Sequence, residues 1–283
     1  LFGCDPMDMA VSGVCGILGG LLNRFMDRMK GNPFFKTIFS AFFMALTAYG
    51  LNACGLAQNV NSVVIGALMI LVPGLLFTNA MRDIIYGDTN SGITRFVQVM
   101  LISMGMALGT AVAWNTASLL WMAPRNLEEL SNPLLITALG SLVGCIGFSI
   151  LFNIHGPGGL LCAMGGVLTW VIFDVIVKFS ADEMLAYFVG AVLASVYAEV
   201  MARLRKYPAI SYLVVSLFPL IPGAGIYYTM YYAVHGNMER FAAQGTHTAA
   251  IVGVIAVGVL LVSTMVRLSY TWKETMGKNQ AGG

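Results

Sequence analysis

Apolar runs of about 20 residues recur along the whole chain, and they constrain its fold more than any other feature. Each run is long enough to cross a hydrocarbon core about 30 Å thick as a helix. With 58% hydrophobic residues, 10% charged residues and a mean hydropathy of +0.80, the sequence lies far from the composition of soluble domains. The sequence therefore predicts an all-α fold, a polytopic bundle of membrane-spanning helices.

We expect nine spans, joined by short polar connections that leave no room for a soluble domain. An odd number of spans places the two ends of the chain on opposite sides of the membrane. The sequence starts at Leu1 without an initiator methionine or the basic flank of a signal peptide, so we expect a truncated N-terminus. The expected spans cover roughly 7–23, 34–54, 62–81, 94–121, 133–152, 157–177, 184–203, 209–235 and 247–271.

The basic residues predict an orientation, because Lys and Arg concentrate in short cytoplasmic loops. Numbering the connections alternately assigns twelve of the 15 Lys and Arg residues to one side. That side contains the loops near 24–33, 82–93 and 203–208, together with the C-terminus. The C-terminus is therefore predicted to be cytoplasmic.

The sequence contains an internal repeat. A shift of 149 residues, which carries Pro73 onto Pro222, places the region 62–109 on 211–258 without a gap. The glycines that follow the two prolines, Gly74 and Gly223, also align. Because apolar bias supplies some identities by itself, these aligned proline–glycine pairs carry most of the weight.

We predict two transmembrane repeats, residues 1–122 with about four spans and residues 132–272 with about five. The span at 133–152 has no partner unless a helix precedes Leu1. A complete repeat would then hold five spans, and an odd number makes the second repeat enter the membrane in the opposite sense. The result would be an inverted-topology repeat with one broken helix in each half.

The proline–glycine pairs interrupt a helix near its centre in each repeat. Pro73 and Pro222 remove a backbone donor, and Gly74, Gly223 and Gly225 permit close approach of a ligand. Unpaired backbone at that depth is tolerated only against protein or a wet cavity. Inverted repeats with broken helices are typical of secondary transporters, whose substrate sites lie where the breaks meet.

The half-helices that begin near Leu75 and Ala224 would point free N–H groups and partial positive charge at such a site. A carboxylate is the ligand that this arrangement favours. A simple kink in each helix remains the alternative. Side chains able to hydrogen-bond a small polar solute follow both breaks: Thr78, Asn79, Tyr227, Tyr228 and Thr229.

Four ionisable residues are candidates for proton coupling or gating, because charges in or near spans often mark ion paths. They are Asp8, Arg82, Asp83 and Asp88. Asp8 and Asp83 are favoured, since each shares a span or a repeat with the predicted site, whereas Asp88 is well placed to cap a loop. A hydrated charge at the membrane interface is the alternative.

Other classes of function find little support in the sequence. The five cysteines are scattered singly without metal-ligand spacing, so we expect no metal and no cofactor. A net charge of +2 without a concentrated basic patch argues against nucleic acid. Because no nucleophile–base pair and no HExxH motif occur, we expect no enzyme.

The broken helices resemble a known family. ILVPGLLFTNAMRDIIYGD resembles the signature of the threonine/serine exporter family, and LFPLIPGAGIYYTMYYAVHG resembles the signature of its second half. The resemblance covers essentially all 283 residues. Fused members carry ten spans and a soluble N-terminal domain, and we expect that domain and the first of those helices to be missing here. Asp8 occupies a place where an acid is expected. The motif positions are Pro73, Gly74, Thr78, Asn79, Arg82, Asp83, Gly87, Asp88, Pro222, Gly223, Gly225 and Tyr228.

The resemblance implies proton-driven export of small carboxylate-bearing metabolites across a bacterial inner membrane. Threonine and serine are the expected substrates, and succinate, the substrate associated with two-subunit relatives, is the alternative. A passive channel is an alternative of another class. The expected partners are the substrate, protons and the lipid bilayer, and a homo-oligomer or a further N-terminal segment remains open.

Overall fold

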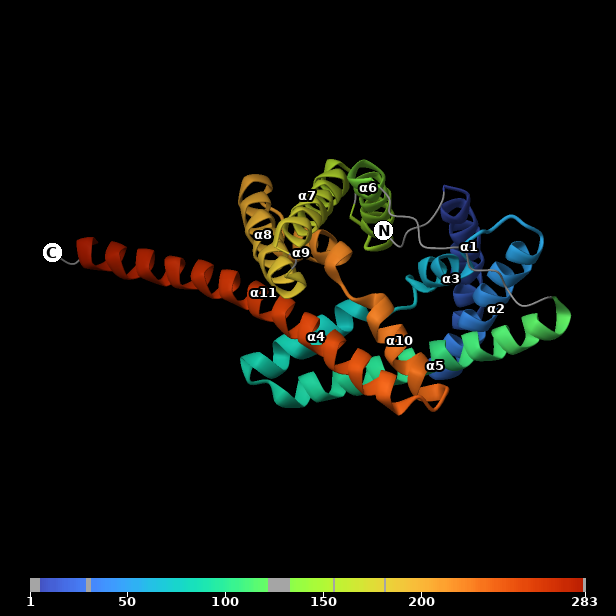
Figure 1. Ribbon diagram of the computed structural model, residues 1–283. Coiled ribbons are helices and arrows are strands. Elements are labelled where there is room, and N and C mark those ends of the chain that lie inside the picture. The colour runs from blue at the N-terminus through green and yellow to red at the C-terminus, as the bar shows by residue number, and fades with distance from the viewer. Residues whose placement is uncertain (1–5, 29–31, 122–132, 155, 181, 282–283) are drawn as a thin grey trace. The chain divides into compact units, whose positions relative to one another are not determined.

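The computed structural model describes residues 6–28, 32–121, 133–154, 156–180 and 182–281. All regular structure in these ranges is helical, which confirms the predicted all-α class. The helices, labelled in Figure 1, are α1 (Pro6–Arg28), α2 (Pro33–Ala53), α3 (Val60–Leu68), α4 (Gly74–Tyr86), α5 (Thr89–Leu120), α6 (Leu134–Leu151), α7 (Pro157–Ser180), α8 (Glu183–Arg205), α9 (Ala209–Leu217), the 3₁₀ turn η1 (Phe218–Leu220), α10 (Gly223–Val234) and α11 (Met238–Ala281).

The long apolar helices confirm a polytopic membrane protein. Among the described residues, 7 helices are long and apolar enough to cross a membrane, and α9 with η1 and α10 forms an eighth candidate bent by 55°. The predicted span at 62–81 is different, because it is divided between α3 and α4, which are too short to cross alone. The 7 uninterrupted helices leave the two regions that the sequence predicted to be broken, 62–81 and 209–235.

The described residues cluster into two compact units, and each unit takes segments from both halves of the sequence. The first unit contains residues 1–80, 93–133 and 222–250, and the second contains the remainder. The first broken region, 69–73, belongs to the first unit. In the second, 221–222, the boundary between the units falls between Ile221 and Pro222. The units group residues that contact one another and do not compare the two halves of the sequence. The inverted repeat therefore stays a prediction.

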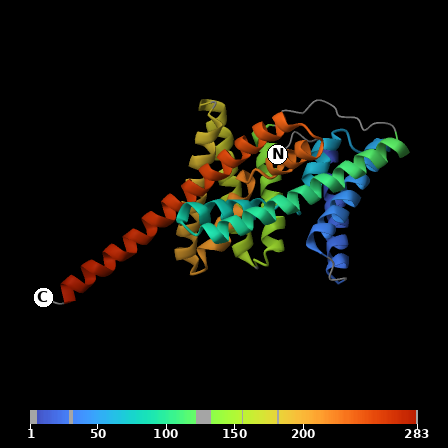
Figure 2. The same cartoon turned by 90° about the horizontal axis from the view of Figure 1, so that it is seen from below.

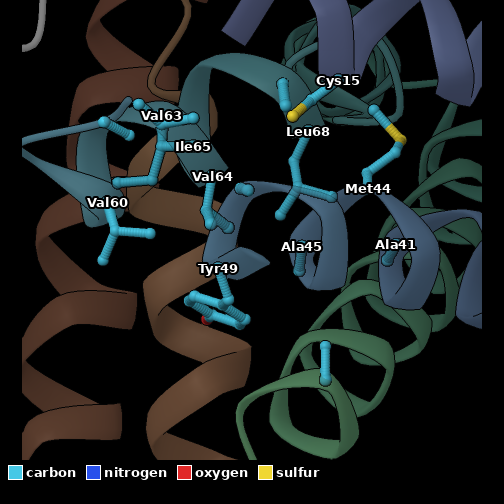
Figure 3. Packing of buried hydrophobic residues seen from close by; sticks show 14 of the residues in the cluster. Cys15, Ala41, Met44, Ala45, Tyr49, Val60, Val63, Val64, Ile65 and Leu68 are labelled. Atoms are coloured by element: carbon cyan, nitrogen blue, oxygen red, sulfur yellow. The ribbon is translucent and has the colours of Figure 1, made fainter. Parts of the chain in front are cut away.

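The core of the first unit lies where α1, α2 and α3 pack together. Figure 3 shows Tyr49 of α2 close to Val60 and Val64 of α3, within a set of apolar side chains that are almost fully buried. The α5 helix crosses α2 closely, since a Cβ atom on Gly109 would contact the carbonyl oxygen of Ile38. The same core includes Tyr227 of α10.

The second unit has a matching three-helix arrangement, in which α7, α8 and α9 contact one another and α6 packs on α7. Figures 1 and 2 both show α6, α7 and α8 side by side. Here α11 crosses α8, and a Cβ atom on Gly258 would lie 3.2 Å from the carbonyl oxygen of Phe188. Gly109 and Gly258 are related by the same shift that aligns the breaks.

The loops after α4 and α10 also match. Gly87 and Gly236 have positive φ angles of 101° and 72° and end the two helices. The N–H of Asp88 bonds to the oxygen of Asp83 at 2.9 Å, and the N–H of Asn237 bonds to the oxygen of Tyr232 at 2.9 Å. This is the Schellman arrangement, which favours glycine at the left-handed position.

Candidate functional site

The first break separates α3 from α4. The N–H groups of Leu71 and Val72 both donate to the oxygen of Leu68, at 2.8 and 3.2 Å, so the end of α3 tightens into a turn. Pro73 follows and has no N–H to donate. Residues 69–73 therefore lie outside any helix, and α4 begins at Gly74.

The second break is shorter. The α9 helix continues into the 3₁₀ turn η1, where the N–H of Ile221 donates to the oxygen of Phe218 at 3.2 Å. Only Ile221 and Pro222 lie outside helical structure before α10 begins at Gly223. The chain bends by 55° between the two helical parts.

Both half-helices start without a side-chain cap. Pro222 is the N-cap residue of α10 and makes no capping hydrogen bond, and Pro73, in the same place before α4, has no side-chain oxygen to offer. The first N–H groups of a helix have no partner within it. Each half-helix therefore presents N–H groups that have no partner within the helix and the positive end of its dipole, which suit an anion.

The structure brings the two breaks together. A Cβ atom on Gly223 would lie 2.9 Å from Cγ1 of Val72 and 3.0 Å from Sδ of Met69. Val72 directly precedes Pro73, so the breaks contact each other within the first unit. Glycine at position 223 permits this approach, because a larger residue would clash with the first break.

The hydroxyl groups that follow the breaks bond to the backbone one turn earlier. Thr78 Oγ1 donates to the oxygen of Gly74 at 3.2 Å, and Thr229 Oγ1 donates to the oxygen of Gly225 at 2.7 Å. Both threonines are buried and keep their acceptor lone pairs. Asn79 is half-buried and makes no side-chain hydrogen bond within the described part of the chain.

Tyr227 is buried against the first unit's core. Its hydroxyl donates to Thr110 Oγ1 of α5 at 3.1 Å. Sequence reasoning named Tyr227 but missed Thr110 and also missed Tyr49 and Trp114, whose rings lie 5.5 Å apart in an edge-on contact. Nothing in the sequence relates α2 or α5 to α10, so these partners carry no sequence signal.

Gly225 has a packing role. A Cβ atom there would lie 2.6 Å from Oγ1 of Thr248 and 3.4 Å from Nε2 of Gln244, both on α11. The prediction that Gly225 admits a ligand therefore stays a prediction, whereas its close approach to α11 is observed. Thr248 and Gln244 are polar residues within or beside a predicted span, a signal that sequence reasoning did not use.

Asp8 is the most deeply buried ionisable residue of the predicted set, with 1% exposure. Its carboxylate accepts the N–H of Gln58 at 2.7 Å and the N–H of Asn59 at 3.2 Å. These bonds fix the start of α3, the helix that ends at the first break. Nδ2 of Asn59 is buried and has no partner among the described residues.

The other predicted gating residues belong to the second unit. Arg82 lies 3.7 Å from Asp83 along the end of α4. The side chain of Asp88 accepts the N–H of Ser91 at 3.3 Å, which is a capping bond at the start of α5. Arg82, Asp83 and Asp88 therefore belong to a different unit from residues 69–73 of the first break.

The described residues include no group of three or more His, Cys, Asp or Glu side chains placed to hold a metal ion. The chemistry available at the breaks is therefore that of backbone donors, hydroxyl groups, one amide and aromatic rings.

Comparison with known proteins gives consistent results for both halves. A family model described as "Threonine/Serine exporter, ThrE" matches residues 137–265, and a second threonine/serine exporter model matches residues 1–117. The chain is 22% identical over 250 residues to a protein of Corynebacterium glutamicum named threonine/serine exporter, covering 82% of this chain and 49% of that protein. The chain thus spans about half the length of this curated relative.

No solved structure matches the chain. The two family models cover successive halves of the sequence and each includes one of the breaks. On these matches the chain belongs to the threonine/serine exporter family.

Proposed function

We propose that the protein exports small carboxylate-bearing metabolites through the membrane by alternating access, with threonine and serine as the first candidates. One observation carries this proposal: two half-helix N-termini, each preceded by proline and without a side-chain cap, meet in the first unit. Such termini stabilise an anion through backbone N–H groups. Broken helices that meet in this way are typical of secondary transporters.

The substrate follows from this chemistry and from the named relative. Threonine and serine each carry one carboxylate for the half-helix N-termini and one hydroxyl that can bond to Thr78, Thr229 or Asn79. A dicarboxylate such as succinate is the second candidate, because two half-helix N-termini could each hold one carboxylate. Succinate carries a second carboxylate and lacks both the amino group and the hydroxyl group of threonine and serine.

Proton coupling is assigned to Asp8. Charged residues elsewhere in the described parts of α1 and α2, such as Arg24, Arg28 and Lys36, lie toward the opposite ends of those helices, and α3 has none. Protonation of Asp8 would weaken its acceptance of the N–H groups that begin α3. A proton would thereby loosen the helix that ends at the first break. Asp83 is the alternative carrier.

The wider arrangement belongs to the same proposal. We place the chain in a bacterial inner membrane with a cytoplasmic C-terminus, on the asymmetry of its Lys and Arg residues. The two repeats would have opposite orientations and exchange access to the breaks between the two sides of the membrane.

Flux measurements in proteoliposomes test the proposal. Vesicles loaded with labelled threonine, serine or succinate are compared with and without an imposed proton gradient, for the wild type and for Asp8→Asn and Asp83→Asn. We expect gradient-dependent threonine and serine efflux that Asp8→Asn uncouples from the proton gradient. Efflux that follows only the solute gradient in the wild type would identify a passive channel and overturn the coupling mechanism.

A further inference from the structure

The α5 helix carries a buried hydroxyl group without a partner. Ser103 is 0% exposed, and its Oγ makes no hydrogen bond within the described part of the chain. We propose that this hydroxyl donates a hydrogen bond to the carboxylate of the substrate. The inference rests on the proposed function and adds to it a substrate-contacting residue that lies outside the half-helices.

Ser103 is an exception among the buried hydroxyl groups. Thr110 donates to the carbonyl oxygen one turn earlier in α5, and Ser40 donates to an asparagine of α1. Ser103 makes neither kind of bond, a property that it shares with two serines of the second unit, Ser141 and Ser216. A buried hydroxyl without a partner is costly within a membrane span, so an acceptor from outside the chain would stabilise it.

Two contacts fix the direction in which Ser103 faces. Phe96 and Thr110 lie seven residues before and after Ser103, and seven residues make almost two full turns, so all three share one face of α5. At one end of this face, the ring centroid of Phe96 lies 5.7 Å from that of Phe77 in α4. At the other end, Thr110 accepts the hydroxyl of Tyr227 in α10. The face that carries Ser103 at its centre is therefore turned toward α4 and α10.

The two breaks lie beside the middle of this face. Phe77 and Tyr227 are each about one turn beyond the start of their half-helix. The chain reverses between α4 and α5, so the residues that precede Phe77 lie beside those that follow Phe96. The second break is at the same level, since a Cβ atom on Gly223 would lie 2.9 Å from Cγ1 of Val72. All of these contacts lie within the first unit.

The corresponding helix of the second half packs without hydroxyl groups at these positions. The 149-residue shift carries Ser103 onto Val252 and Thr110 onto Val259 of α11. Both valines are buried, so close packing of such a helix does not require a polar side chain. The hydroxyl of Ser103 is thus specific to α5, the helix whose partner on α10 is Tyr227.

A carboxylate is the acceptor that fits this donor. Threonine, serine and succinate share this group, and a hydrogen bond to a charged acceptor is stronger than one to a neutral acceptor. Because Ser103 is fully buried, a solute reaches it only when α5 and the half-helices separate. Alternating access supplies such an opening.

Heat unfolding and ligand binding of the purified chain together test this inference. Ser103→Ala removes the hydroxyl, and Ser103→Cys keeps a weak donor in a side chain of similar shape. Ser40→Ala is the control, because Ser40 is also fully buried in the first unit but has a partner, Asn23. The unfolding temperature is measured without ligand, and the affinity is measured with labelled L-threonine.

We expect Ser103→Ala to unfold no lower than the wild type, because no hydrogen bond is lost, and Ser40→Ala to unfold about 2–4 °C lower. Ser103→Ala should bind threonine about 10- to 100-fold more weakly than the wild type. Ser103→Cys should fall between the two, and Ser40→Ala should bind threonine as the wild type does.

Wild-type affinity in both Ser103 variants would overturn the inference and leave the proposed function intact. A lower unfolding temperature of Ser103→Ala with unchanged affinity would also overturn it, because the hydroxyl would then serve the folded chain itself, for example through a buried water. A wild type that neither binds nor exports threonine or succinate would overturn the proposed function, and the inference with it.

Discussion

The helices α4 and α10 are related by the 149-residue sequence shift and begin in the same way, yet they present different chemistry. Each starts at a glycine after a proline and ends in a Schellman turn at Gly87 or Gly236. Along the helix, α4 carries threonine, asparagine, arginine and aspartate where α10 carries four tyrosines. The two helices therefore share the backbone geometry of their starts and ends and differ in the side chains along them.

Under the proposed function, this difference predicts separate tasks for the two helices. Backbone N–H groups at both helix starts suit an anion whatever side chains follow. Selectivity then depends on the side chains, which are polar or charged in one copy and aromatic in the other.

The breaks themselves also differ. Five residues, 69–73, lie outside helical structure before α4, whereas only two lie outside before α10. The starts of the preceding half-helices differ in the opposite direction, since Asp8 accepts two N–H groups at the start of α3 whereas α9 follows Pro208 without a side-chain bond. The first break is the longer one, and a buried carboxylate, Asp8, lies at the far end of the helix that precedes it.

The largest effect is expected from restoring backbone donors at the breaks. Pro73→Ala and Pro222→Ala should each lower the export rate, and Pro222→Ala should lower it at least about tenfold, because a gap of two residues closes into a continuous helix more readily than a gap of five. Initial efflux rates at equal expression measure this. Pro33→Ala, at the first turn of α2, is the control. Equal effects of the two variants would remove the distinction between the breaks.

Overpacking at the two helix crossings should come next. Gly109→Ala should cost about 1–3 kcal/mol of unfolding free energy, and Gly258→Ala should cost less, since a Cβ atom at Gly109 would overlap the carbonyl oxygen of Ile38 whereas one at Gly258 would lie 3.2 Å from that of Phe188. Denaturant unfolding in detergent measures the difference. Gly144→Ala, which has open space around its Cβ position, should be near neutral. A larger cost at Gly258 would contradict the comparison.

Removal of the buried carboxylate at the start of α3 is compared with removal of an exposed N-cap at the start of α8. Asp8→Ala should destabilise the protein by about 2 kcal/mol, because two backbone N–H groups lose their acceptor in a buried setting. Asp182→Ala removes an exposed N-cap of α8 and should cost about 1 kcal/mol. Heat unfolding ranks the two variants. If Asp8→Ala is the milder change, Asp8 does not hold α3 in place.

The smallest effect is expected where the two copies are most alike. Asp88→Ala and Asn237→Ala each remove one capping bond, to the N–H of Ser91 and Arg240 respectively. Each should cost about 0.5–1 kcal/mol, because both caps are exposed. Export should remain at the wild-type rate in both variants. A selective loss of export in Asp88→Ala would support the gating role predicted for this residue from the sequence.

Sequence reasoning predicted the helical fold and the positions of the breaks closely. The half-helices were expected near Leu75 and Ala224, and they begin at Gly74 and Gly223, because proline and glycine report local backbone geometry. The long extent of α11 was not predicted, since polar residues at its end continue a helix without continuing a span. Hydropathy detects spans and is insensitive to helix continuation outside them.

The partners of the site residues could not be predicted in the same way. Thr110 and Thr248 contact α10 just after the second break, at Tyr227 and Gly225, and Tyr49 belongs to the same core cluster as Tyr227. All three lie on other helices and are brought there by tertiary packing. A single sequence contains no information on which faces of two helices meet. Asp8 was named as an ionisable residue, but its bonds to Gln58 and Asn59 depend on the approach of α1 to α3.

The first unit is built from segments that lie far apart in the sequence, and this determines when it can be completed during synthesis. Its early segment ends at residue 80, and its last segment covers residues 222–250. The ribosome must therefore finish most of the chain before Tyr227 can reach Thr110. Until then, the apolar surface that awaits α10 has to be sheltered by lipid or by a chaperone.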